Sequence, residues 1–368
     1  MTGAILDSLF QPFTSLGQPA TESQLQMYFR LDYTVRDLSL PPESKIEFDF
    51  GNPHRRKVEL RCPSEQEQAK GHSKNDCFCT TSALAEPNPK VAFIFSQIET
   101  GDYPSGDKPN LKYLLPNGTQ VLLPSLIKFP ENFRSYVEGV LKELNDLATR
   151  TISVLLWRSN ELGPHNRIST RGLHWSKDAS FWHPMPSDTR SRLTFGFPMN
   201  INRPLDRVQS IVADGNSEPL YHDLFREAWE QCFDKPRSAL VIGMAACEIA
   251  VKRCISVLVP EAEWLATNLP TPPLPQILMQ YFPQLPARCT FNGIVKPPPK
   301  HVMDDLKDGA TIRNSLVHAG ANPPAQKVES ILRSVRDVLW MVDYYCGAVW
   351  ALEYIRPETS SALTGESK

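Results

Sequence analysis

The spacing of apolar residues changes near residue 200, and that change constrains the fold more than any other feature of this chain. Before it, short segments alternate apolar and polar residues, a spacing typical of strands with one buried face. After residue 219 the apolar residues recur at three- and four-residue steps, which is the helical period. Prolines and Asp214-Gly215-Asn216 make 201–219 the predicted linker. We therefore expect an α+β protein, with a strand-rich domain over 23–200 and an all-helical bundle over 220–356.

The strand-rich region carries clear local signals for individual elements. The expected elements are a loose arm at 1–22, an antiparallel meander of strands at 29–35, 46–50 and 58–60, a surface loop at 62–90, buried strands at 91–95 and 151–157, a helix at 133–148, and hairpins joining 111–115 to 120–123 and 172–176 to 181–183. The role of this region is not indicated by its sequence.

The only grouping with metal-ligand chemistry is Cys62, His72, Cys77 and Cys79, within the expected 62–90 loop. Zinc sites usually take two pairs of ligands, each pair spaced by two to four residues. A single Cys-Phe-Cys with distant partners misses that pattern, so we favour a loop without zinc and expect no metal or other cofactor. The remaining cysteines are scattered, several in apolar runs, as reduced thiols are.

Two tryptophans, Trp175 and Trp182, stand beside His174 and His183 in the second expected hairpin. Aromatic side chains near arginine suit stacking on nucleic-acid bases. Tryptophans also close the core of a small sheet, and we favour that interpretation.

The second region contains helices separated by prolines. The expected helices span 220–233, 236–259, 276–282, 301–318 and 325–355, with proline-rich linkers between 269 and 300 and a disordered tail at 357–368. The 236–259 helix is apolar nearly all round, which places it at the centre of the bundle. The last helix repeats Val328, Val335, Val342 and Val349 at seven-residue intervals, a stripe that fits a bundle core.

Arg313 and His318 enclose a six-residue segment near the end of the 301–318 helix. Arg313 falls within the apolar stripe, where a guanidinium needs a carboxylate or an anion. Glu248 is one candidate carboxylate; a surface pair between Glu248 and Lys252, four residues on, is the alternative. An arginine holds phosphate bidentately, and a histidine exchanges a proton near neutral pH. Both suit cleavage of RNA, whose 2′-hydroxyl is its own nucleophile.

The segment Arg313-Asn314-Ser315-Leu316-Val317-His318 resembles the signature of HEPN domains, which is an arginine, four to six residues, and a histidine. Residues 312–320, with the helix that carries 248–252, are most similar to the Apea-like branch found in bacterial proteins. The resemblance covers roughly the last 140 residues. It implies a helical bundle that dimerises around the motif and, in many members, a metal-independent endoribonuclease. Arg313, Asn314 and His318 would then be catalytic, and a defence or toxin role follows by analogy alone.

At 100° per residue, His318 falls nearly opposite Arg313 on a regular helix. Either the helix loosens before His318, or the site is assembled from two copies of the chain.

The net charge of −2 argues against a broad basic surface, so contact with RNA should be local, and no DNA partner is expected. The first residues lack a basic segment followed by an apolar core, and no stretch reaches membrane-span length. We therefore expect a cytoplasmic homodimer without membrane contact.

Two hypotheses follow. The first is an endoribonuclease in which Arg313 holds the scissile phosphate and His318 moves the proton. The second is a non-catalytic HEPN dimerisation module that binds RNA or a nucleotide and is attached to a sensor domain. In it Arg313 and His318 would be interfacial salt-bridge and capping residues.

Overall fold

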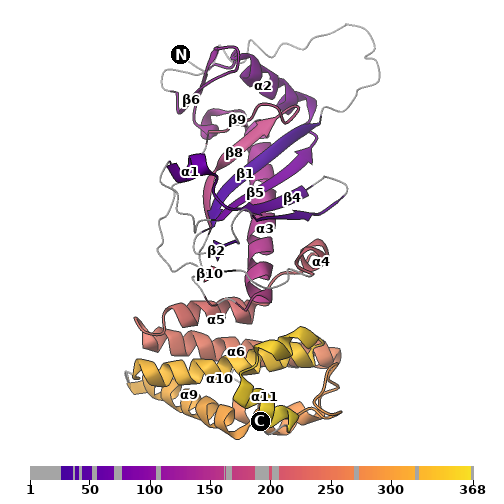
Figure 1. The fold of residues 1–368 in the computed structure, drawn as a ribbon, viewed down its shortest axis with the longest axis vertical. Coiled ribbons are helices and arrows are strands. Elements are labelled where there is room, and N and C mark those ends of the chain that lie inside the picture. Colours follow the sequence, from indigo (N-terminus) through magenta and orange to yellow (C-terminus); the bar gives the residue numbers. More distant parts are fainter. Residues whose placement is uncertain are drawn as a thin grey trace.

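The computed structural model has an α+β fold, with a strand-rich half and a helical half joined by one long helix (Figure 1). The structure describes residues 26–35, 38–40, 44–51, 56–69, 77–104, 109–160, 162, 168–186, 199–200, 207–268, 273–319 and 323–365. The arm at 1–22 lies outside these residues.

The strand-rich half is organised around an antiparallel sheet of order β3-β4-β5-β1-β8-β9. Its strands are β1 (Met27–Val35), β3 (Lys45–Asp49), β4 (Arg56–Arg61), β5 (Cys77–Ala85), β8 (Ile168–Ser176) and β9 (His183–Pro184). A short parallel pair joins β2 (Leu38–Ser39) to β10 (Met199–Asn200). The expected meander is therefore wrong in its order, because β1 pairs with β5 and β8 and not with β3.

Strand β5 lies within the segment expected to be a surface loop, and it separates β4 from β1 in the sheet. Cys77, Cys79, Thr81 and Ala83 are buried, while the residues between them face the other side. These small side chains carry the period-two pattern of a strand, but weakly, because hydroxyl and thiol groups replace large apolar ones. The polar residues before β5 include α1 (Glu65–Ala69).

Both expected hairpins are present. Strand β6 (Leu111–Leu114) pairs with β7 (Gln120–Leu123) across the Pro116–Thr119 turn. Strand β8 pairs with β9 through His174 opposite Pro184 and Trp175 opposite His183. A short 3-10 turn, η2 (Leu126–Lys128), follows the first hairpin.

Residues 91–95, expected to be a strand, belong to α2 (Pro89–Thr100). The Asn88 side chain accepts a hydrogen bond from the Val91 N–H at 3.0 Å, and Pro89 occupies the first turn, as in well-formed helix starts. Gly101 ends the helix with a φ of 83°. Because the segment is helical, Phe95 is buried while Phe93 is 63% exposed.

Residues 151–157 were also expected to be a strand, but they continue α3 (Glu131–Arg158) without a break. No proline or glycine occurs between Ala148 and Arg158, so the helical hydrogen bonds continue through residues 151–154, three of which are β-branched. A fully apolar run has no period that distinguishes a buried strand from a buried helix. Helices α2 and α3 cover one face of the sheet, and Phe29, Phe95, Phe133 and Trp175 lie in the core between them.

The helical half is built around α6 (Pro236–Leu258), which packs against α5, α9 and α10. The other elements of the helical half are α5 (Leu220–Glu230), η3 (Pro260–Ala262), α7 (Glu263–Asn268), α8 (Leu274–Gln276), a π-helix η4 (Ile277–Tyr281), η5 (Phe282–Gln284), α9 (Lys300–Ala319), α10 (Ala325–Tyr345), η6 (Val349–Tyr354) and α11 (Pro357–Thr364). Helix α4 (Val208–Ala213) belongs to the core of the strand-rich half. Helix α4 lies in the segment expected to be a linker and packs on α3. Among the described residues, no helix combines the length and apolarity needed to cross a bilayer.

The end of the chain differs from expectation in two ways. Helix α10 stops at Tyr345, and Gly347 turns the backbone with a φ of 110°, so Val349 leaves the stripe and is 66% exposed. The expected disordered tail instead contains α11, which is fixed to α10. Thr359 donates a hydrogen bond to the buried Asp337, and Leu363 is buried in the bundle core.

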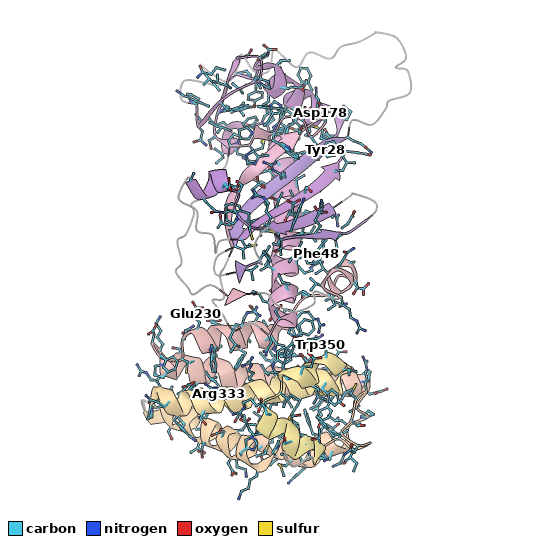
Figure 2. All side chains as sticks on the ribbon, viewed as in Figure 1. Tyr28, Phe48, Asp178, Glu230, Arg333 and Trp350 are labelled. Atoms are coloured by element: carbon cyan, nitrogen blue, oxygen red, sulfur yellow. The ribbon has the colours of Figure 1, made fainter. Side chains whose placement is uncertain are left out.

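The C-terminal end of α3 is inserted into the bundle. The Trp157 indole N–H donates to Asp343 at 3.2 Å, and the Asp343 carboxylate also accepts from Tyr221 and binds His222. The Arg158 guanidinium lies 3.9 Å from the ring centre of Trp350, which Figure 2 labels where the two halves meet. These contacts make α3 a continuous connection between the sheet and the helical half.

Candidate functional site

Helix α9 places Arg313 and Asn314 beside α6. Gly309, one turn earlier, lies at a close approach, because a Cβ there would be 2.9 Å from both Met244 Sδ and Ile331 Cγ2. That approach holds α9 against α6 and α10, and it brings position 313 next to the middle of α6. Asn314 follows on the exposed side of α9.

The Arg313 guanidinium forms an ion pair with Glu248, donating through Nη1. The two side chains are 25% and 14% exposed, so Glu248 is not the exposed edge residue that a simple surface pair with Lys252 requires. Lys252 lies one turn further along α6 and is half-buried. No described residue accepts a hydrogen bond from Nε or Nη2 of Arg313, and neither atom is sealed from solvent. Part of the guanidinium fork is therefore open to an anion.

A cavity of 640 Å³ lies beside Arg313 and Asn314. Its walls come from α9, from α6 and from the segment that contains α8 and η4. The lining residues are Met244, Glu248, Pro273, Leu274, Pro275, Gln276, Met279, Gln280, Lys307, Ala310, Thr311, Arg313 and Asn314. The volume lies within the range of small-molecule sites.

His318 is the penultimate residue of α9, and its side chain lies outside the part of the chain that the structure describes. Helix α9 continues to Ala319, so the expected loosening of the helix before His318 does not occur. Five residues of regular helix turn position 318 by about 140° from position 313. On this backbone, one chain does not present positions 313 and 318 on the same side of α9.

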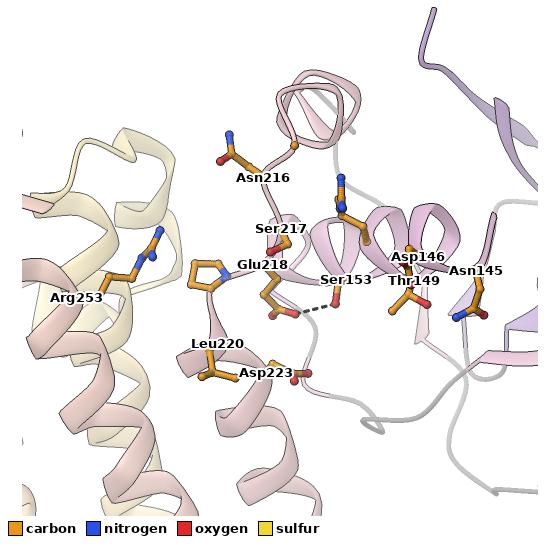
Figure 3. Close-up of a pocket in the computed structure, with 13 residues that line it drawn as sticks. Asn145, Asp146, Thr149, Ser153, Asn216, Ser217, Glu218, Leu220, Asp223 and Arg253 are labelled. Carbon is orange, nitrogen blue, oxygen red and sulfur yellow. Dashed lines mark hydrogen bonds between the residues drawn. The ribbon is translucent and has the colours of Figure 1, made fainter. Parts of the chain in front are cut away.

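A second cavity, of 670 Å³, lies where α3 meets α5 and α6 (Figure 3). Its buried carboxylate, Glu218, accepts from both terminal nitrogens of Arg226 and from Ser153 Oγ at 3.2 Å. Burial raises the pKa of Glu218, and the Arg226 charge opposes that shift. Asp223 binds Arg226 as well, at 3.1 Å. Since Glu218 binds Ser153 of α3 and Arg226 of α5, we assign this cluster a structural role at the junction, although Nε of Arg226 is buried without a hydrogen bond among the described residues.

A third hollow, of 690 Å³, lies on the sheet face opposite α3. In the register of the sheet, Arg30 stands between Ser82 and His174, and Asp32 lies beside Thr80. Trp182 stacks on the Arg30 guanidinium at 4.6 Å. Burial lowers the pKa of His174, so this imidazole is neutral near pH 7.

Trp175 is fully buried and stacks on the buried His183, so the core interpretation of Trp175 is confirmed. Cys77 and Cys79 are buried in β5, where burial raises the pKa of both thiols. His72 lies outside the described residues. Within those residues there is no cluster of three or more His, Cys, Asp or Glu side chains that could hold a metal ion.

Comparison with protein-family models, with curated proteins and with solved structures gives no match for this chain.

Sequence patterns identified Arg313, Asn314 and Glu248, but they missed Gln276, Met279 and Gln280, which face the same cavity. The prolines around these residues indicated a linker, and the short helix predicted there gave no reason to connect it with Arg313. Four-residue spacing of Leu274, Leu278 and Phe282 was the available signal, because it buries one face and turns the other outward.

Proposed function

We propose that this chain is a metal-independent endoribonuclease of HEPN type that acts as a dimer. The observation that carries the proposal is the half-open guanidinium of Arg313 at the edge of the 640 Å³ cavity, oriented by Glu248 from a neighbouring helix. A carboxylate fixed in this way limits the positions of the guanidinium while leaving nitrogen atoms for a phosphate.

In the proposed reaction, Arg313 binds the scissile phosphate and stabilises the negative charge that it gains in the transition state. His318 of the second chain removes the proton from the 2′-hydroxyl, whose oxygen attacks the phosphorus. The bond from phosphorus to the 5′-oxygen breaks, and the leaving 5′-oxygen takes a proton from solvent. The products are a 2′,3′-cyclic phosphate and a 5′-hydroxyl. Asn314, which is exposed next to Arg313, positions the side chain of Arg313 or of His318.

The helical phase of α9 supports the proposed dimer, because one chain does not present positions 313 and 318 on one side of the helix. Exposed apolar side chains on η4, Met279 and Tyr281, lie near the same cavity and supply contact area for a second chain. The low net charge fits a local contact with RNA at this edge. A setting in bacterial defence is part of the same proposal by analogy.

The test uses single-stranded RNA incubated with the purified chain in EDTA. Arg313→Ala and His318→Ala should each lower cleavage by about 100-fold or more. Arg333→Ala is the matched control, because Arg333 is an exposed arginine paired with Glu329 on α10. Thermal melting of each variant separates loss of activity from loss of folding, and Arg313→Lys keeps a charge beside Glu248.

Mixing the two inactive variants tests the shared site directly. If Arg313 and His318 act across the dimer, a mixed dimer carries one complete site, and the mixture should recover about a quarter of the parent activity. Cleavage by His318→Ala equal to the parent would reject the reaction. A variant that melts at lower temperature while the parent itself cleaves nothing would favour the non-catalytic module.

A further inference from the structure

The cavity beside Arg313 has one wall that the proposed reaction does not use. This wall is the segment from Pro273 to Gln280, which contains α8 and η4. Leu274, Leu278 and Phe282 are buried and fix the segment to the bundle core. Its opposite side is exposed, and the π-helical turn there is a rare backbone form that is frequent at functional sites.

Three of the seven polar side chains that line the cavity are uncharged carboxamides. Gln276, Gln280 and Asn314 are exposed, and no described residue forms a hydrogen bond with their side-chain amides. Each amide offers donors and an acceptor side by side. The edge of a nucleobase presents the same pairing of donors and acceptors, which is why asparagine and glutamine recognise bases bidentately.

The remaining surface of the cavity fits a flat, weakly polar ring. Met244 and Leu274 are apolar and buried at its base, and the half-exposed Met279 stands at its rim. Methionine adapts its shape to a ring and makes favourable sulfur–aromatic contacts. Lys307, exposed on α9, lies at the same cavity and adds a cation for a neighbouring phosphate.

We propose that this cavity binds one unpaired base of a single-stranded RNA, next to the phosphate held by Arg313. This inference rests on the proposed function, which places the phosphate. A base inside a duplex cannot present its edge to a cavity of this kind, so the substrate is single-stranded at the cleaved position. Gln276 and Gln280 then determine which base precedes or follows the cleaved bond.

The first experiment measures binding without cleavage. Four homopolymeric 2′-O-methyl hexanucleotides, of A, C, G and U, lack the 2′-hydroxyl nucleophile, and their affinities are measured by fluorescence anisotropy. The parent should prefer one of them by about tenfold or more, as expected for bidentate amide recognition. The Gln276→Ala/Gln280→Ala variant should bind all four with affinities within about twofold of one another.

Gln326→Ala is the matched control, because Gln326 is an exposed glutamine on α10 away from the cavity, and it should keep the preference. Equal binding of all four probes by the parent, absence of binding, or a preference kept by the double variant would each overturn the inference.

The second experiment sequences the cleavage products of a random-sequence RNA. The parent should show a base preference at one position beside the cleaved bond, and the double variant should still cut but lose that preference. Binding preference without cleavage by the parent would reject the proposed reaction and support the base site. Cleavage with an unchanged base preference in the double variant would support the proposed reaction and reject the base site.

Discussion

The hollow on the sheet face and the cavity beside Arg313 differ in the groups that surround their cations. On the open face of the sheet, each cation has a carboxylate beside it: Arg30 pairs with Asp32, and Arg61 holds Glu67 through two hydrogen bonds of 2.7 and 2.9 Å. Lys57 lies between Glu47 and Glu59 in the same way.

In the bundle cavity, Arg313 donates to a single carboxylate, that of Glu248, through Nη1 alone. The side-chain amides of Gln276, Gln280 and Asn314 beside it are exposed. The sheet hollow pairs its three cations with carboxylates and leaves the buried Nδ1 of His174 without a hydrogen bond among the described residues, whereas the bundle cavity has three exposed carboxamides beside Arg313. Hollows of similar volume, 690 and 640 Å³, therefore offer different groups to a ligand, and the proposed reaction concerns the cavity in the bundle.

The largest effect on stability is expected from Phe95→Ala. This substitution tests whether the core of the strand-rich half unfolds separately from the bundle. Phe95 contacts Phe29, Phe133 and Trp175, and its removal should lower the free energy of unfolding by about 3–5 kcal/mol. Urea unfolding measures the change, and hydrogen exchange should show β1 losing protection while α6 keeps it. Phe93→Ala, on the exposed side of α2, should change stability by less than about 0.5 kcal/mol. Equal effects of the two substitutions would contradict a helix here.

The next effect concerns the helical half. Deleting residues 357–368 removes α11, including the buried Leu363 and the Thr359 hydrogen bond to Asp337. The expected loss is about 3 kcal/mol, from apolar burial and from a hydrogen bond to a charged group. Deleting 366–368 alone is the control and should have no measurable effect. A melting temperature unchanged by the long deletion would show that α11 does not stabilise the bundle.

The smallest effect is expected on the sheet face. Glu67→Gln breaks the pair with Arg61 and should cost at most about 1 kcal/mol at pH 7, because both side chains are partly exposed. Hydrogen bonding to Arg61 lowers the pKa of Glu67 to about 2, so the folded chain favours the carboxylate. The pair therefore stabilises the fold above pH 4.5, and this contribution is lost as the pH falls toward 2.

Urea unfolding at pH 7 and pH 3.5 measures the difference between the Glu67→Gln variant and the parent. RNA cleavage by the variant should equal that of the parent. A stability difference that grows in acid would contradict the ion pair between Glu67 and Arg61. A lower rate of cleavage would mean that the sheet face contributes to the proposed reaction.

The long helices α5, α6, α9 and α10 were predictable because a proline stands at or directly before the first residue of each, and because the apolar residues of α10 are periodic. Helix α11 was not predicted, because its segment is short and polar. The order of the sheet was not, because the partners of β1 lie far along the chain and β5 is built from small residues. Asn88, Pro89 and Gly101 were sufficient signals for α2, yet the apolar run between them also fits a strand.

The same division applies to the candidate site. Arg313 was identified because its charge lies in the apolar stripe of the 301–318 helix and needs a partner. Glu248 was identified because it is a charged residue in the middle of an otherwise apolar helix. Whether Glu248 can contact Arg313 depends on how closely α9 packs on α6. The close approach of the two helices at Gly309 permits this contact, and the sequence near Glu248 contains no signal for it.

Helix α3 has a further consequence for how such a chain can change during evolution. It spans 28 residues, or about 42 Å, and its last turn is held by the bundle while its first turns carry the sheet. Inserting a single residue in its middle would rotate one half against the other by about 100°, whereas seven residues, close to two turns, would nearly restore the original setting. Homologous chains should therefore tolerate length changes in this helix only in steps close to whole turns.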